Sequence, residues 1–205
     1  MAYDYEKTHA AIMASAARHF MEVGFAGASV RQICKDAGVT NGAFYAHFES
    51  KEDLFGKLVG PALAGLDELH GNETSHYMDV RSPEDVVEAL NMAFTTDESV
   101  IHYIYEHEDA FRLLLKASGG TSFENYPSKI VEEEKRGTIA FFELCRSFVK
   151  RPENMSESLA AQASSLIVST IFDCLLSEKT EEEAVRETKL ASEFCIAGLR
   201  QIWGI

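Results

Sequence analysis

The chain has 205 residues and a formal net charge of -14 at pH 7, with 33 acidic and 19 basic residues. This length suffices to bury a sizeable core in one large or two small domains. Helix-forming residues dominate and only four prolines occur, which predicts an all-α fold. No apolar run approaches the roughly 18 to 20 residues that span a bilayer and no signal-peptide pattern is present, so we expect a soluble, cytoplasmic protein.

The N-terminal sequence predicts one helix over about residues 5–23 and a pair of short helices after it. Apolar residues of the first helix fall on one face. From Val30 to Phe48 the apolar spacing is helical on both sides of Gly38, which can adopt the backbone conformation that a tight turn needs. Two short helices around such a turn, with a polar tip on the second, are the plan of a DNA-reading helix-turn-helix.

Capping residues predict where these helices begin. Ser29 is placed to cap the first short helix. Ser50 followed by Asp53 has the spacing of a capping box, which opens the next helix. That helix is expected to kink at Pro61, which removes a helix hydrogen bond, and to fade near residue 70.

The remaining sequence predicts further helices separated by polar or glycine-rich breaks. Residues 70–81 are polar and predict a loop, after which three helices are expected within residues 83–118. A long helix over about residues 123–148 and a final pair over 156–177 and 180–203 complete the prediction.

The last two predicted helices combine small with large apolar residues, and a capping box at Thr180 and Glu183 opens the second. Small residues allow close helix approach, so this hairpin can pair with a second copy as a four-helix bundle, or pack only within its own domain. The candidate interface residues are Leu159, Ala163, Leu166, Ile167, Ala197, Gly198 and Ile202.

The charge is distributed unevenly along the chain. Through Lys57 there are six basic and seven acidic residues, so nearly all of the negative charge lies in the remainder. Because phosphate neutralisation supplies most non-specific DNA affinity, a near-neutral N-terminal region should bind DNA weakly outside its specific site. This departs from the usual basic footprint of a DNA-binding domain.

The stretch from Lys7 to Leu58 resembles the DNA-binding domain of the tetracycline-repressor (TetR/AcrR) family of bacterial transcription regulators. The matching segments include Val23-Gly24-Phe25, Ser29 to Ile33, Ala37-Gly38-Val39, Gly42-x-Phe44-Tyr45-x-His47-Phe48 and Ser50 to Leu54. The resemblance implies a three-helix domain with the helix-turn-helix over residues 1–50 and a larger helical effector-binding and dimerisation domain over residues 51–205. It implies about nine helices in all and dimerisation through the last two.

Eight positions are predicted to contact DNA. Asn41 at the tip of the second short helix can bond bidentately to adenine, whereas Arg31 can reach a guanine or the backbone, or remain solvated. His47 and Lys51 match family positions that hold phosphate. Hydroxyl groups, an exposed ring and a glycine that permits close approach complete the set: Ser29, Arg31, Thr40, Asn41, Gly42, Tyr45, His47 and Lys51.

A small apolar or aromatic effector is expected between helices of the C-terminal domain, because family members enclose ligands there. Aromatic residues are numerous in this region, although most of these rings can be explained as core. The candidate ligand-binding residues, of which the first and third would orient the polar end of the ligand, are His102, Tyr103, Glu106, Phe111, Phe142 and Phe172.

Other kinds of site have little support. The sequence has no Gly-rich phosphate loop, nucleophile elbow or HExxH motif, so we expect neither an enzyme nor a cofactor. Four scattered cysteines predict buried thiols rather than a disulfide framework or a zinc site. The segment HYIYEHED has metal-ligand residue types, but only His102 and Glu106 share a helical face, so we expect no metal site.

The sequence thus predicts a homodimeric repressor that a small molecule releases from a palindromic DNA operator. The alternative is a DNA-bound adapter or activator whose C-terminal domain binds a protein and no small molecule. A closed apolar cavity would favour the repressor, and an exposed apolar patch on a solid core would favour the adapter.

Overall fold

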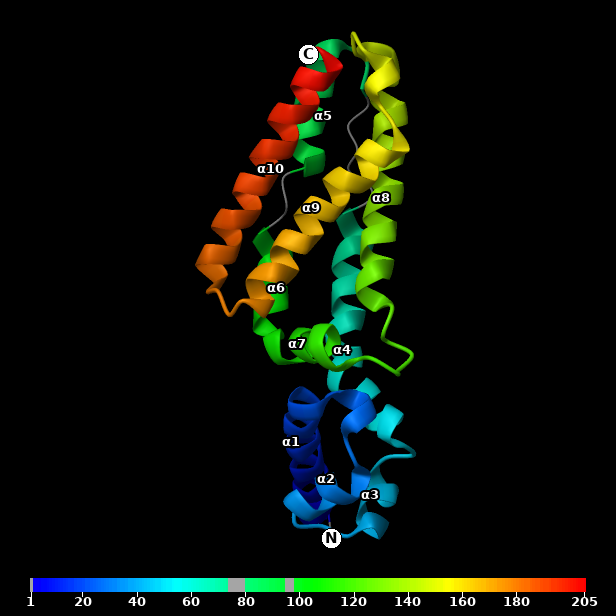
Figure 1. Ribbon diagram of the computed structural model, residues 1–205, viewed down its shortest axis with the longest axis vertical. Helices are drawn as coiled ribbons and strands as arrows, with labels where there is room; N and C mark the ends of the chain where they lie inside the picture. Colours follow the sequence, from blue (N-terminus) through cyan, green and yellow to red (C-terminus); the bar gives the residue numbers. More distant parts are fainter. Residues whose placement is uncertain (1, 74–79, 95–97) are drawn as a thin grey trace. The chain divides into compact units, whose positions relative to one another are not determined.

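The computed structural model describes residues 2–73, 80–94 and 98–205, which form α-helices joined by turns and short loops (Figure 1). The predicted all-α fold class is confirmed. The chain divides into two compact units. The N-terminal unit comprises Met1–Gly65 and His107–Tyr126, and the C-terminal unit comprises Leu66–Glu106 and Pro127–Ile205.

The N-terminal unit consists of a long first helix with four other helical segments. These are α1 (Ala2–Gly27), α2 (Val30–Asp36), α3 (Asn41–His47), the first part of α4 (Lys51–Glu73) and α7 (Glu108–Ala117). Every one of them buries apolar side chains, as sequence periodicity predicted for the first four. The largest of these side chains are Ile12, Phe20, Ile33, Phe44, Leu54, Phe55 and Phe111.

The first helix is longer than predicted and bends sharply near its end. The bend lies at Gly24, whose φ of 71° and ψ of 167° are rarely adopted by residues with a side chain. It brings the ring of Phe25 to 5.7 Å from that of Phe20 and 5.6 Å from that of Phe55. An aromatic cluster thereby joins the end of α1 to the start of α4.

Residues 107–126 pack with the N-terminal helices, which the sequence did not predict. Helix α7 contacts α1, and the loop after α7 is tied to α4. The Glu52 carboxylate accepts a hydrogen bond from the Ser122 N–H (2.9 Å), which lowers the pKa of Glu52. The ring of Phe123 lies 6.0 Å from that of Phe55. The boundaries of the compact units therefore differ from the expected division after residue 50. That division remains a prediction about where DNA binding ends and effector binding and dimerisation begin.

Helix α4 is a single helix that includes Pro61. Proline cannot donate to the carbonyl of Lys57, yet the helix continues for twelve more residues, to Glu73. Of the loop predicted over residues 70–81, residues 70–73 are helical and residues 74–79 lie outside the described part of the chain.

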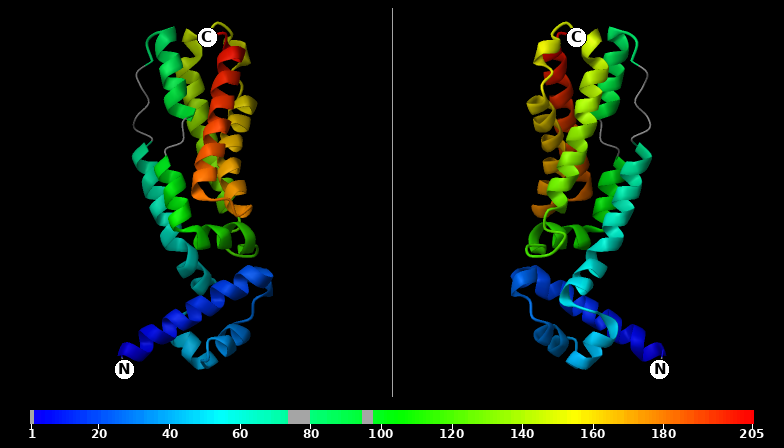
Figure 2. Two further views of the ribbon diagram at one scale, coloured as in Figure 1. Left: turned by 90° about the vertical axis from the view of Figure 1, so that its left-hand side faces the viewer. Right: turned by 90° about the vertical axis from the view of Figure 1, so that its right-hand side faces the viewer.

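The C-terminal unit contains α5 (Pro83–Phe94), α6 (Glu98–Glu106), α8 (Tyr126–Cys145), α9 (Glu157–Leu176) and α10 (Glu181–Trp203). Helices α9 and α10 form an antiparallel hairpin (Figure 2). The capping box predicted for α10 is confirmed: the Glu183 N–H donates to the Thr180 hydroxyl (3.2 Å), and the Thr180 N–H donates to the Glu183 carboxylate (2.9 Å).

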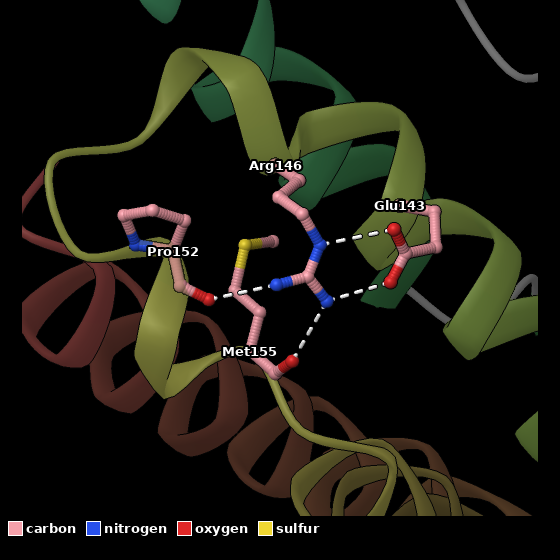
Figure 3. Close-up of polar contacts among 4 residues, drawn as sticks. All are labelled: Glu143, Arg146, Pro152 and Met155. Atoms are coloured by element: carbon pink, nitrogen blue, oxygen red, sulfur yellow. Dashed lines mark hydrogen bonds and ion pairs between the residues drawn. The ribbon is translucent and has the colours of Figure 1, made fainter.

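The turn between α8 and α9 is held by one arginine (Figure 3). The Arg146 guanidinium donates two hydrogen bonds to the Glu143 carboxylate (2.9 and 2.6 Å), which lowers the pKa of Glu143. It also donates to the carbonyls of Pro152 (2.9 Å) and Met155 (3.0 Å). The same connection also caps α10, because the Asn154 side-chain amide donates to the Ile202 carbonyl in the last turn of that helix.

Helix α9 is more apolar than the sequence analysis expected. It is 20 residues long and apolar enough to cross a bilayer, so the expectation that no such stretch exists was wrong. A core helix of a soluble protein can have the same composition, and α9 packs against α10. Within its apolar stretch 39% of the residues are buried, and the exposed positions of α9 are polar: Glu157, Ser158, Gln162, Ser169 and Asp173.

The core at the end of α10 gives a direct test of the packing. The ring of Phe142 is 2% exposed and lies edge-on against Trp203 at 4.8 Å. Phe142→Ala should lower the free energy of unfolding by about 3 to 5 kcal/mol, because it removes a buried ring and leaves a cavity. Urea unfolding followed by circular dichroism measures this. The control is Leu144→Ala on the same helix, where a 38% exposed side chain should change stability by less than about 1 kcal/mol. Equal effects of the two substitutions would contradict the packing.

Candidate DNA-binding site

The predicted helix-turn-helix is present as α2, a tight turn and α3. Gly38 in the turn has a φ of 69°, in the left-handed region that the sequence argument required. The Val39 N–H donates to the Cys34 carbonyl (2.9 Å) and closes the end of α2. A buried hydrogen bond from the Ser15 hydroxyl to the Ile33 carbonyl (3.0 Å) fixes α2 to α1. The pair is therefore held rigidly from its inner side.

The two short helices are capped differently. The Thr40 hydroxyl accepts a hydrogen bond from the Ala43 N–H (3.1 Å) and caps α3. Ser29 occupies the corresponding position before α2, but its side chain makes no capping hydrogen bond, so that predicted cap is wrong. At the start of α4, the Ser50 hydroxyl accepts from the Asp53 N–H (3.0 Å), and the Asp53 carboxylate reaches back to Glu49 rather than to Ser50.

Six of the eight predicted DNA contacts lie on the exposed side of this motif. Asn41 and Tyr45 are one helical turn apart on α3, and Tyr45 is 63% exposed. A side chain at Gly42 would meet only the Thr40 hydroxyl within 4 Å, so the tip of α3 is open outward. The exposed set is Ser29, Arg31, Thr40, Asn41, Gly42 and Tyr45, and its contact with DNA stays a prediction.

Lys51 has a structural role that the sequence did not reveal. Its ammonium donates hydrogen bonds to the carbonyls of Phe25 (2.6 Å) and Ala28 (2.9 Å), and it lies 4.2 Å from the centre of the Phe25 ring. An ammonium carries three hydrogens, so one remains for a phosphate. Lys51 thus joins the start of α4 to the end of α1, whatever contact it makes with DNA.

His47, the last residue of α3, belongs to a group of rings. Its ring centre lies 4.0 Å from that of Tyr5 and 5.6 Å from that of His9, both on α1. Burial lowers the pKa of His47 below its ordinary value of 6.5, and repulsion by His9 lowers it further, while Glu6 opposes the shift. The sequence identified His47 only through the family resemblance.

The six candidate ligand residues do not form one site. Phe111 belongs to the N-terminal unit and the other five to the C-terminal unit. Within the latter, His102 pairs with Glu181 at the first residue of α10, whereas Phe142 packs against Trp203 at its last residue. A helix of that length separates its ends by roughly 33 Å at 1.5 Å per residue. Periodicity along one helix could not reveal this separation.

His102 and Glu106 are engaged on the surface. The imidazole of His102 lies 3.0 Å from the Glu181 carboxylate and 3.3 Å from that of Glu106. The hydrogen bond with Glu181, followed by the charge of Glu106, raises the pKa of His102. Both side chains are exposed, so they form a surface ion-pair network between α6 and α10.

The predicted interface residues lie on the α9 and α10 hairpin with different exposure. On α9, Ala163 is buried and Leu159, Leu166 and Ile167 are half-buried against the core. On α10, Ala197 and Ile202 are exposed, and nothing lies within 4 Å of a side chain placed at Gly198. The sequence analysis missed Leu190 and Phe194, which are 54% and 72% exposed. They precede Gly198 and Ile202 at intervals of four, so spacing places all four on one face of α10 but does not show that this face is exposed.

Comparisons with known proteins agree with this geometry. Residues 12–58 match the family model of bacterial regulatory proteins, tetR family. The HTH-type transcriptional repressor BepR of Brucella suis biovar 1 (strain 1330) is 34% identical over 94 residues, so the match spans 45% of this chain and 45% of BepR. This chain therefore aligns with about half the length of that relative.

Solved structures share the fold. NalD, the secondary repressor of the MexAB-OprM multidrug efflux pump in Pseudomonas aeruginosa, has a TM-score of 0.55 at 21% identity, over 92% of this chain and 95% of NalD. SmeT in complex with triclosan has a TM-score of 0.53 at 18% identity, over 93% of this chain and 90% of SmeT.

Two threonine caps allow stability and site geometry to be separated. Thr40→Ala and Thr180→Ala each remove a cap hydroxyl and should each lower the free energy of unfolding by about 1 kcal/mol. Only Thr40→Ala should weaken DNA binding, measured by fluorescence anisotropy, and Thr40→Ser should restore it because the oxygen is retained. Equal loss of DNA affinity in both alanine variants would mean that stability alone is being measured.

Proposed function

This chain belongs to the tetR family of bacterial regulatory proteins, and we propose that it is a cytoplasmic, homodimeric repressor that binds a palindromic operator and leaves it when an effector binds. The observation that carries the proposal is the exposed tip of α3 within the matched residues. Its inner side is fixed by Phe44 and Phe48, whereas Asn41 and Tyr45 face outward. Rigid backing and a polar exposed edge are what base readout in a major groove requires.

Specific contacts must supply much of the affinity. The helices that carry the site have almost equal numbers of basic and acidic residues, so few phosphates can be neutralised. Affinity for arbitrary DNA should therefore be low, and Asn41 is proposed to read a base while Arg31 reads a base or holds the backbone.

Dimerisation is proposed through α9 and α10. The exposed stripe of Leu190, Phe194, Gly198 and Ile202 runs along α10, and α9, which packs against α10, carries the half-buried Leu166 and Ile167. Exposed apolar surface of this extent on a helical hairpin is covered well by a second copy related by two-fold symmetry. The small surface at Gly198 permits close helix approach.

An effector site is proposed on the inner side of α10. Thr188 and Ser192 lie one turn apart, are 1% and 4% exposed, and their hydroxyls have no hydrogen-bond partner within the described residues. An unpaired buried hydroxyl is costly, and the polar end of an apolar or aromatic ligand would relieve that cost. SmeT, which has a similar fold, holds triclosan. This position replaces His102 and Glu106, which are exposed.

The adapter or activator function is the second candidate, because the exposed Leu190 and Phe194 could also receive a different protein. Thermodynamic linkage between ligand binding and operator binding distinguishes the repressor from the adapter or activator. An inducer must bind the DNA-free state more tightly, so operator DNA must weaken the same ligand by the same factor. Calorimetric titration of an apolar aromatic probe, with and without operator, measures that factor.

The base-reading role of Asn41 predicts a defined change in specificity. Asn41→Ala should weaken the preferred site by about 1 to 3 kcal/mol and leave affinity for random DNA almost unchanged. Selection of bound sequences followed by competition binding measures both. The control is Asn125→Ala, the same chemical change at another exposed position of the N-terminal unit. If Asn41→Ala retained the preference, α3 would not read bases through its tip.

The interface predicts a monomer after one substitution. Phe194→Glu should fold normally, because the side chain is exposed in the protomer, but it would place an unpaired charge in the dimer interface. The dimer dissociation constant should rise by about 100-fold or more. Analytical ultracentrifugation measures this, with Met92→Glu, a 49% exposed position on α5, as control. Dimers of unchanged stability would place the interface elsewhere.

A further inference from the structure

Three rings from two helices form a small cluster beside the recognition motif. Tyr5 and His9 lie on α1, and His47 is the last residue of α3. The Tyr5 and His47 rings are 4.0 Å apart at their centres, and His9 lies 5.6 Å from His47 and 4.7 Å from Phe48. The first turns of α1 therefore fix how the His47 side chain lies.

The cluster constrains where the hydrogen of each imidazole lies. The Nδ1 atoms of His9 and His47 are buried and have no hydrogen-bond partner within the described residues. A hydrogen on a buried Nδ1 would be a donor without an acceptor, and burying such a donor costs free energy. Burying an Nδ1 that carries no hydrogen costs less. In the favoured neutral form of His47 the hydrogen is thus on Nε2, the nitrogen further from the backbone.

We infer that Tyr5 and His9 are positioning residues that hold His47 as a neutral hydrogen-bond donor, with Nε2–H directed to a DNA phosphate. The inference rests on the proposed DNA-binding function and adds the protonation state and the residues that enforce it. The N-terminal helices carry almost equal numbers of basic and acidic residues. A neutral donor can bind phosphate there without the cost of burying a cation.

The surroundings oppose a charged His47. Among its titratable neighbours on α1, His9 lowers the pKa of His47 and Glu6 raises it, and the Tyr5 ring lies close to the imidazole. From α4, Lys57 lies 5.2 Å from the centre of the adjacent Phe48 ring and adds positive charge. Burial acts in the same direction, so the pKa of His47 is lowered. Protonation therefore destabilises the folded unit as the pH falls below 6.5.

Substitutions can distinguish a neutral donor from a cation. The side-chain amide of His47→Gln can donate from near the position of Nε2, whereas that of His47→Asn reaches only near Nδ1. For a neutral donor, His47→Gln should retain operator affinity within about threefold, and His47→Asn should lose roughly tenfold. Neither should change the slope of affinity against salt concentration, since no counterion is released.

The experiment joins this binding series to NMR of the imidazoles. Long-range 1H–15N spectra of the full chain at pH 7 should show His47 neutral with hydrogen on Nε2. In Tyr5→Ala its pKa should move upward toward 6.5, and in Tyr5→Phe it should stay as in the wild type. Hydrogen on Nδ1, or an unchanged pKa in Tyr5→Ala, would overturn the positioning role. A salt slope lowered by about one in His47→Gln would overturn the neutral donor. Failure of the wild type to select any DNA would instead refute the proposed function, and the NMR result would still stand.

Discussion

The ammonium of Lys51 is the interaction on which the N-terminal unit depends. It donates to the carbonyls of Phe25, in the last turn of α1, and of Ala28, just beyond it. Backbone carbonyls at this end of a helix have few helical partners and favour a positive charge. The same contact holds α4 against the Phe25 ring. Because α2 and α3 occupy the chain between these two points, their position follows from where α1 ends and α4 begins.

The side chains around α3 have two separate roles in this arrangement. Buried residues such as Phe44 and Phe48 set the orientation of the helix, and Asn41 and Tyr45 are left at the surface. Basic residues are few, so affinity cannot come mainly from charge. Hydrogen bonds from neutral side chains then contribute more of the affinity for DNA. Those to base edges give sequence specificity, and those to phosphates fix the position of the protein.

Most local features could be predicted from the sequence, although the Ser29 cap was wrong, and the long-range contacts could not. The turn at Gly38 and the capping box at Thr180 depend on a few neighbouring residues, and both are confirmed. The contact of Lys51 with Phe25 joins positions 26 residues apart and leaves no spacing signal. The candidate ligand residues could not be grouped in space for the same reason, because helical periodicity cannot tell that His102 and Phe142 lie near opposite ends of α10.

The stripe on α10 shows a different limit. Leu190, Phe194, Gly198 and Ile202 have regular spacing, yet an apolar stripe usually marks the side of a helix that faces the core. Only the structure shows that this stripe is exposed while Thr188, Ser192 and Cys195 face inward. We propose that the exposed stripe and the buried hydroxyls give α10 two functional sides, one for a second copy and one for a ligand.

Protection mapping of the wild-type protein on its selected DNA tests the central claim most directly. Two reading helices carried by a two-fold dimer should protect two equivalent half-sites on one face of the duplex. Their centres should be separated by about 34 to 36 Å or a small multiple of it. A single half-site without symmetry, or uniform protection that does not depend on sequence, would contradict the account.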